Sequence, residues 1–265
     1  MINYIRFLFI ILLFLPAACK NTQLSQSMQK KVYLSEIANL ENDYKSTVWT
    51  IRKNAVLKCG EYPSERTMQL LIRAVNDTHT SIQAEAVNQL SIYDNNSAFN
   101  TLINISQDRT RSDIVRISAL NGLSRYKSEK AFPVFLDNIN DKNNLIRQSA
   151  YRGLLRIEDK KIQNLSIDYI ILGLNDESTS VQMTVLDEIH IKSPLIYKIY
   201  KDFLTSKENH NKNTMMIKIL KGLSGYDIDD ELEQTLRSLL TNNNTEIRLL
   251  SLKVLKSQPR LNKKR

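Results

Sequence analysis

The chain repeats one short apolar pattern seven times. Four segments share the form Ile/Val-x-x-x-Ala, and three later segments follow it more loosely. They begin at Ile51, Ile82, Val115, Ile146, Val181, Met215 and Ile247. These first positions recur every 31 to 35 residues. A period of that size is typical of repeat proteins, in which each period folds into one supersecondary unit that stacks on its neighbours.

The spacing inside each segment indicates a helix. The fifth position is small or apolar in every unit: Ala55, Ala86, Ala119, Ala150, Val185, Ile219 and Ser251. Four residues later comes another such residue: Cys59, Leu90, Leu123, Leu154, Ile189, Leu223 and Leu255. Steps of four place side chains on one face of an α-helix, whereas a strand would alternate them. The pattern therefore predicts one buried helical stripe per unit.

Another helix precedes the helix that carries each stripe. Apolar residues at helical spacing come first, as at 68–75, and a polar turn pair such as Asn76-Asp77 or Asn140-Asp141 follows them. Asn and Asp supply the turn and cap hydrogen bonds that a chain reversal needs. A single helix pair cannot bury both of its faces, so each unit depends on its neighbours. The sequence predicts an all-α fold with seven helix pairs over residues 32–256.

The repeat resembles the HEAT family, in particular its short bacterial HEAT-like form, whose second helix carries V-R-x-x-A-x-x-x-L. The residues that match the arginine are Arg52, Arg116, Arg147 and Arg248, and those that depart from it are Gln83, Gln182 and Met216. The resemblance implies a right-handed α–α superhelix of the HEAT or armadillo type with the second helices on its concave side. It also implies that the arginines pair with turn acids and the tops of neighbouring helices, and that the three departing units pair more weakly.

The N-terminus has the order of an export signal. Arg6 precedes the unbroken apolar run 7–15, and Pro16, two alanines and Cys19 follow. A membrane span needs about 20 apolar residues, so this run is too short to cross a bilayer. The segment resembles the lipobox of bacterial lipoproteins, except that Leu15 lies four residues before the cysteine and Pro16 occupies the usual leucine position. Ordinary cleavage and an uncleaved anchor are the alternatives.

This resemblance implies a domain order and a location. Residues 1–18 form the signal peptide, residues 19–31 contain the lipidated Cys19 and a polar tether, and residues 257–265 form a basic tail. We expect a monomer that is lipid-anchored in the bacterial cell envelope, at the periplasmic face or the outer membrane. Contact of the tail with anionic headgroups is an alternative to simple solvation.

The residues that could carry chemistry are scattered. His79, His190 and His210 lack metal-site spacing, and Cys59 belongs to a buried stripe, so we expect no disulfide, no metal site and no cofactor. The acidic residues between Asp227 and Glu233 begin an expected helix, where negative charge is favourable. We therefore expect a protein without catalytic activity.

A stacked solenoid offers a long concave surface, so the leading hypothesis is a protein-interaction scaffold whose partner is an envelope protein or peptide. Trp49 is expected to pack against the first helix, or else to serve as an aromatic anchor for the partner. The other candidate contacts are Lys53, Asn88, Asn121, Arg152, Glu188, Lys221 and Lys253. The HEAT resemblance leaves open a bilin lyase or isomerase, or a DNA-glycosylase-like enzyme. A nucleic-acid or anionic-polymer binder is less favoured, because Glu85, Asp187 and Glu188 would interrupt a basic stripe.

Overall fold

The computed structural model describes residues 22–190 and 192–258, and this part of the chain contains helices and no strand. The first helices of the seven pairs are α2 (Thr22–Asp43), α4 (Glu65–Ala74), α6 (Asn96–Gln107), α8 (Phe132–Asn138), α10 (Lys160–Leu174), α12 (Pro194–Thr205) and α14 (Asp230–Ser238). The second helices are α3 (Trp49–Lys58), α5 (Thr80–Leu90), α7 (Asp113–Tyr126), α9 (Asn144–Leu155), α11 (Thr179–Glu188), α13 (Asn213–Gly222) and α15 (Thr245–Lys256). Short 3-10 helices lie at 59–61, 129–131, 207–209 and 239–241.

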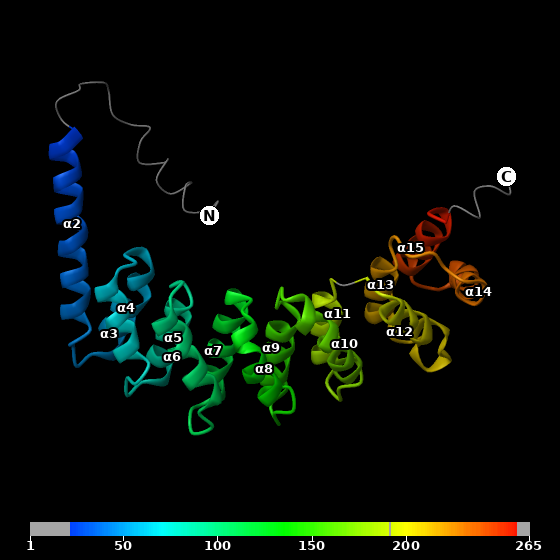
Figure 1. The fold of residues 1–265 in the computed structure, drawn as a ribbon, viewed down its shortest axis with the longest axis horizontal. Coiled ribbons are helices and arrows are strands. Elements are labelled where there is room, and N and C mark those ends of the chain that lie inside the picture. The colour runs from blue at the N-terminus through cyan, green and yellow to red at the C-terminus, as the bar shows by residue number, and fades with distance from the viewer. Residues whose placement is uncertain (1–21, 191, 259–265) are drawn as a thin grey trace.

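The pairs stack into an open arc (Figure 1). Each second helix contacts the next one, from α3 through to α15. In the C-terminal half of the arc, α11, α13 and α15 lie on its concave side and α10, α12 and α14 on the opposite side (Figure 1). The fold is an α-solenoid, so the prediction of an all-helical stack of seven helix pairs is confirmed.

The repeated stripe is the core of the stack. All seven residues at the fifth position are buried, and so are six of the seven that follow four residues later, Ile189 being partly exposed. The first position is buried in every unit except the first, where Ile51 is 41% exposed. α3 is the first second helix of the arc, so no second helix lies on its N-terminal side.

The sequence pattern also fixes the helix ends. Asn95, Asp159, Ser193 and Asp229 each accept a hydrogen bond from a backbone N–H in the first turn of the following helix. Asp229 caps α14, so the acidic group at 227–233 does begin a helix, as expected. Such caps satisfy N–H groups that have no partner inside the helix.

Most of the expected polar tether is helical. Its residues 22–31 form the first half of α2. They continue the helix that packs through Ile37 and Leu40, and no proline or glycine interrupts it. Figure 1 shows α2 extending well beyond the neighbouring helices. Cys19 and the signal segment lie outside the described residues, and so does the tail from residue 259.

Candidate functional site

The turns between paired helices lie along one edge of the arc and carry a ladder of arginines. Arg147 shows its pattern. Its guanidinium donates to the carbonyl oxygens of Asp141 and Lys142 in its own turn, at 2.8 and 3.3 Å. It also donates to both carboxylate oxygens of Asp176 in the turn of the next unit, each at 2.8 Å. One side chain therefore joins two consecutive units.

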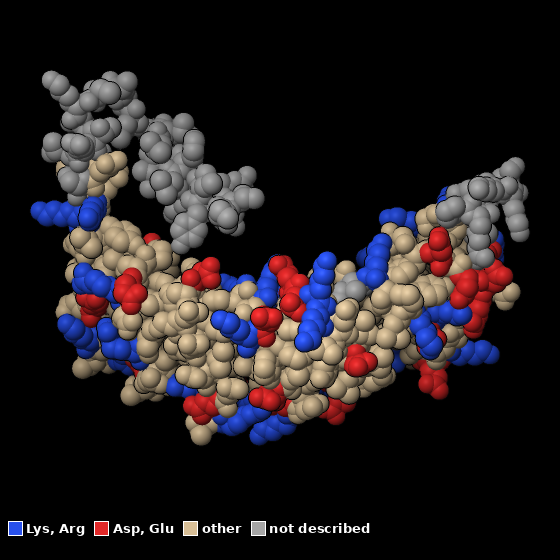
Figure 2. All heavy atoms as spheres, in the orientation of Figure 1, with Lys and Arg blue, Asp and Glu red and all other residues tan. Residues whose placement is uncertain are grey.

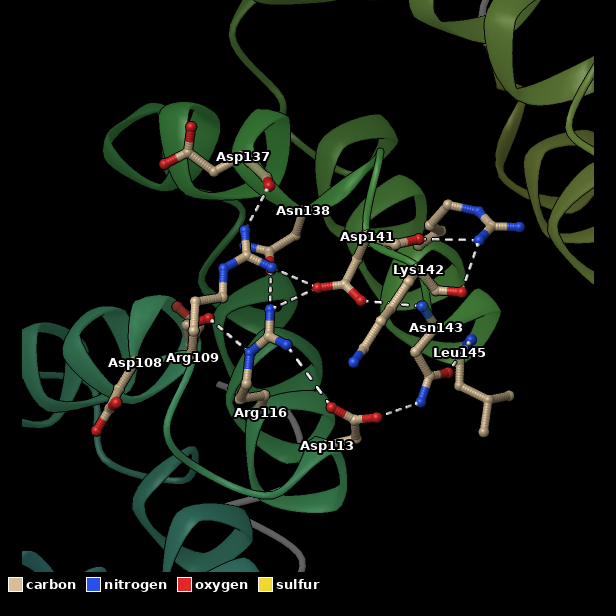
Figure 3. A network of polar contacts seen from close by, with 12 residues as sticks. Asp108, Arg109, Asp113, Arg116, Asp137, Asn138, Asp141, Lys142, Asn143 and Leu145 are labelled. Atoms are coloured by element: carbon tan, nitrogen blue, oxygen red, sulfur yellow. Dashed lines mark hydrogen bonds and ion pairs between the residues drawn. The ribbon is translucent and has the colours of Figure 1, made fainter.

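Two other arginines repeat this arrangement. Arg52 binds both carboxylate oxygens of Asp77 at 2.9 Å and the carbonyl oxygens of its own turn. Arg116 is buried and donates to Asp141 at 2.8 Å and to Asn138 at 2.7 Å. Figure 3 shows Arg109 and Arg116 converging on the single carboxylate of Asp141. The predicted pairing of the repeat arginines with turn acids is confirmed in these units.

Arg248 and the departing positions behave differently. Arg248 is in the last unit and donates to the carbonyls of its own turn and to Thr245. Gln83 and Gln182 each donate to one carbonyl oxygen of their own turn, at 2.6 and 2.7 Å. An amide side chain is too short to reach the following turn as well. Between the second and third units Arg111 takes over, because it reaches back to Asn76 and the carbonyl before it.

The aspartates of the ladder have pKa values below the usual value of a carboxyl group. Burial alone would raise the pKa of Asp176, but the hydrogen bonds from Arg147 and the Ser178 N–H outweigh it and lower the pKa. The same balance lowers the pKa of Asp77 and that of Asp141. Hydrogen bonds and nearby cations both favour the charged form of a carboxyl group. The ladder is therefore structural, because its charged groups pair with one another and hold the units together.

Tyrosines make hydrogen bonds at the opposite edge of the arc, where each second helix ends. The Tyr126 hydroxyl donates to the carbonyl oxygen of Tyr93 in the preceding unit. The Tyr93 hydroxyl lies 2.9 Å from that of Thr67, and the Tyr226 hydroxyl accepts from the Ser193 N–H at 3.1 Å. Thr67 and Ser193 lie at the start of the first helix of the same unit as their tyrosine. These tyrosines end a Leu-Ser-x-Tyr sequence that recurs at 90–93, 123–126 and 223–226. The sequence therefore joins the end of a second helix to the chain around it.

The concave surface is formed by the side chains of the second helices that point away from the first helices. In the central part of the arc, three of the candidate contacts come together on α7, α9 and α11. The Arg152 guanidinium lies 3.3 Å from the Asn121 side-chain oxygen and 3.7 Å from the Glu188 carboxylate. Arg156 binds both oxygens of Glu188 at 2.7 and 2.8 Å. Asn121 and Arg152 remain partly exposed.

Glu188 requires a correction, because its side chain is only 8% exposed. A buried carboxylate held by two arginines is not free to contact a partner. The sequence pattern placed it on the surface face of its helix, but Arg156, which follows the last residue of α9, covers it. Arg156 was not among the expected site residues. The signal that could have found it is its position four residues after Arg152, a spacing that places both on one helix face.

The other candidates lie toward the two ends of the arc. Lys221 pairs with Glu246 at 2.8 Å, across α13 and α15. Asn88 and Lys253 are exposed and Lys53 is partly exposed. Lys53 and Lys253 make no ion pair with any described residue. Both lysine side chains are therefore available to a partner.

Trp49 is not buried against the first helix as expected. Its ring stacks on the His79 imidazole, with the centroids 4.2 Å apart and the planes 5° from parallel. The side chain is 43% exposed. His79 is held in place because its Nδ1 accepts from the Ser81 N–H at the start of α5. The alternative expectation, an aromatic anchor, stays a prediction.

The residues of possible chemical use remain separate in the structure. His79 lies at the start of α5, His190 follows α11 and His210 follows the 3-10 helix at 207–209. Burial raises the pKa of the Cys59 thiol to about 12, which keeps it protonated. Among the described residues no three His, Cys, Asp or Glu side chains cluster as metal ligands would, and no helix is long and apolar enough to cross a membrane.

One hollow on the described part of the chain is shallow and polar. It has a volume of about 660 Å³ and lies at the turn edge of α7, α9 and α11, between Asp113, Asn144 and Glu177. An apolar groove of about 410 Å³ lies on the outer face between α8 and α10, lined by Phe132, Leu165, Tyr169 and Leu172.

Comparisons with known proteins support the fold. Neither a family model nor a curated protein sequence matches the chain. Among solved structures, the chain is similar to YibA of E. coli, with 15% identity, a TM-score of 0.52, and coverage of 92% of this chain and 99% of that one. It is also similar to the CpcE–CpcF complex of phycocyanin lyase from Nostoc sp. PCC7120, with 18% identity, a TM-score of 0.50 and coverage of 83% and 85%. A designed armadillo repeat protein matches at 13% identity and a TM-score of 0.41, over 83% of this chain and 98% of that one.

At these identities the likeness concerns the fold alone. The α-solenoid is shared with proteins of different kinds, one of them a lyase. A shared fold does not transfer an activity from one protein to another. The function must therefore be argued from the surfaces of this chain.

Proposed function

We propose that this protein is an interaction scaffold that binds a protein or peptide along the concave surface of its solenoid, without catalysing a reaction. The observation that carries the proposal is the contrast between the two layers of helices. The second helices contain twelve Lys or Arg and five Asp or Glu, whereas the first helices contain nine and ten. Four of these twelve, the repeat arginines, are held in the turn ladder, so eight basic residues against five acidic ones remain for the inner surface. An inner layer with this basic excess, beside a nearly neutral outer layer, suits a protein that binds through the inner one.

Rigid presentation supports the same proposal. Arginines join five consecutive turns on one edge, and the Tyr126 hydroxyl joins two units on the other. Binding residues held on a rigid framework lose less conformational entropy when the partner binds. The proposal includes attachment to the bacterial cell envelope through a lipidated Cys19, for which the support is the sequence of the export signal.

Site-specific photo-crosslinking in a lipoprotein-processing bacterial host tests the scaffold. A photoreactive amino acid replaces Asn88 or Asn121 on the concave side, and Asn100 or Asn104 in α6 as the matched outer positions. We expect crosslinked protein from the concave positions and none from the outer ones. Equal crosslinking from both layers, or crosslinks to nucleic acid alone, would contradict the proposal. Intact mass of the same protein, compared with Cys19→Ser, tests the attachment separately.

A further inference from the structure

Four of the five acidic residues of the second helices are neutralised by ion pairs, which changes the charge that a partner meets. Asp187 pairs with Lys218, Glu188 with Arg156, and Glu246 with Lys221. Asp113 contacts Arg116 at 3.7 Å and accepts from Asn143. The fifth, Glu85, is partly buried and accepts from the Gln89 amide at 2.7 Å. Figure 2 shows the resulting mixture of basic and acidic side chains along the hollowed upper side.

Three cations on this surface have no such partner. Lys53 on α3, Arg125 on α7 and Lys253 on α15 make no ion pair with any described residue, and Arg125 and Lys253 are exposed. Counted from the first stripe residue of their own units, they occupy the third, eleventh and seventh positions, which are spaced four apart and therefore share one helix face outside the buried stripe. These unpaired positive charges therefore lie at the two ends of the arc, on α3 and α15, and about a third of the way along it, on α7.

Exposed apolar side chains accompany these cations on the second helices. Ile114 is 57% exposed, Leu145 49% and Leu249 61%, and all three belong to second helices. Leu57 on α3 is 50% exposed. A nucleic acid or another uniform polyanion needs closely spaced cations along its path, because its charges are closely spaced. A surface with isolated cations and exposed apolar side chains on the same helices is complementary to a polypeptide that carries both acidic and apolar residues.

We propose that the partner of the concave surface is a protein segment that combines acidic residues with leucine-like apolar ones, and that it runs across the second helices from α3 to α15. This inference rests on the proposed scaffold function and names the chemistry of its partner. Neighbouring helices lie about 10 Å apart, so the six steps span about 60 Å. An extended chain covers about 3.3 Å per residue, so about 18 residues reach from Lys53 to Lys253. The Lys53-to-Arg125 distance of two steps corresponds to about six of these residues.

The test uses a fluorescein-labelled peptide of about 24 residues, composed of Glu, Leu and Ser in the ratio 2:1:1, and fluorescence anisotropy with the full chain. Three other probes are compared with it: the same peptide with Lys for Glu, the same with Ser for Leu, and single-stranded oligodeoxythymidine of similar length. We expect the acidic Leu-containing peptide to bind most tightly, and its affinity to fall as salt is added.

Charge reversal locates the binding. The variant Lys53→Glu/Arg125→Glu/Lys253→Glu is expected to weaken binding of that peptide by about tenfold or more, and the corresponding triple change to Gln by less. The matched control is Arg73→Glu/Lys160→Glu/Lys161→Glu, which makes the same change of charge on α4 and α10 of the outer layer. It should change the dissociation constant by less than about twofold. Helical circular dichroism checks that each variant is folded.

Four results would overturn the inference: tighter binding of the basic peptide, tighter binding of the oligonucleotide, equal binding of the peptide that lacks Leu, and equal sensitivity to the inner and outer triple variants. The scaffold function can survive any of them. If concave crosslinks to a protein persist while the acidic peptide fails to bind, the partner chemistry is wrong and the scaffold stands. If crosslinking also fails, both are wrong.

Discussion

At the scale of single residues, the stack depends on buried charges that act between units. Arg147 and Asp176 have side chains 8% and 9% exposed, and Asp176 also accepts from the Ser178 N–H. Removing one partner of such a pair leaves the other buried and unpaired, which destabilises more than the pair itself stabilises. The repeat arginine could be predicted from the sequence, and its acid could be predicted to lie in a turn. The sequence could not show that one guanidinium binds its own turn and the turn of the next unit at the same time.

Loss of the Asp176 carboxylate should destabilise the protein. We expect Asp176→Ala to lower the free energy of unfolding by about 2 kcal/mol, because two charge-assisted hydrogen bonds are lost. The matched control is Asp202→Ala, which removes an exposed carboxylate that pairs with Lys198 within α12. It should change the free energy by less than about 0.5 kcal/mol. Urea unfolding measures both, and equal effects would show that the ladder contributes no more than a surface ion pair.

The same pair predicts a dependence on pH. The folded-state pKa of Asp176 lies below its unfolded value of about 3.9. Its contribution to stability is therefore fully present above that value and is lost as the pH falls through the folded pKa. The difference in unfolding free energy between the wild type and Asp176→Ala should shrink between about pH 6 and about pH 3. A difference that stays constant over this range contradicts the account.

At the scale of helices, the first helices approach the second ones closely where a glycine allows it. Gly153 in α9 faces the Phe135 ring of α8, and a Cβ built there would lie 2.1 Å from a ring carbon. Gly122 in α7 has more room, because its Cβ would lie 3.1 Å or more from Ser91 and Leu102 atoms. The periodic pattern predicted the helices and their buried stripe. It could not predict which glycine permits a close ring contact, because that depends on the side chain opposite.

Substituting alanine at Gly153 and at Gly122 tests whether the two positions differ in the room they offer a side chain. Alanine normally stabilises a helix relative to glycine by about 1 kcal/mol. We expect Gly153→Ala to destabilise the protein by about 1 to 3 kcal/mol despite this gain, because the Phe135 ring must move. Gly122→Ala should be close to neutral. Thermal or urea unfolding of the two variants tests this, and stabilisation by Gly153→Ala would show that the packing there is loose.

At the scale of the whole molecule, the arginine ladder covers only part of the arc. It joins the turns of the first five units. In the last two junctions, which follow the units of Gln182 and Met216, no hydrogen bond between described residues joins one turn to the next. Successive second helices also contact one another least between α11 and α13. The weaker pairing expected at Gln182 and Met216 is therefore visible in the structure. At Gln83, by contrast, Arg111 supplies the contact between turns that the missing arginine would make. That replacement comes from outside the motif, so the motif could not predict it.

This gap predicts where the stack opens first. The stability of a solenoid is a sum of unit and interface terms, so a weak interface lets the units beyond it unfold separately. We expect amide hydrogens of α12 to α15 to exchange faster than those of α5 to α9 under native conditions. Hydrogen–deuterium exchange read by mass spectrometry measures both groups in one sample. Uniform exchange rates along the arc would contradict the uneven ladder.

The shape and charge of the arc could be predicted only in part. The concave position of the second helices followed from the HEAT resemblance, but the sequence indicated that Asp187, Glu188 and Glu85 interrupt its basic surface. The structure shows Lys218 and Arg156 beside two of these acids, contacts that join residues about 30 positions apart. Which charges remain available to a partner is therefore decided by contacts between units.

The measurement that tests the central claim most directly is a crosslinking scan along the whole concave surface. The photoreactive residue is placed in turn at the seventh position of every repeat: Leu57, Asn88, Asn121, Arg152, Asp187, Lys221 and Lys253. If one partner runs across the second helices, several consecutive positions should crosslink to the same protein, while outer positions such as Asn100 do not. Crosslinks that come from the outer helices alone would show that the concave surface is not the binding surface.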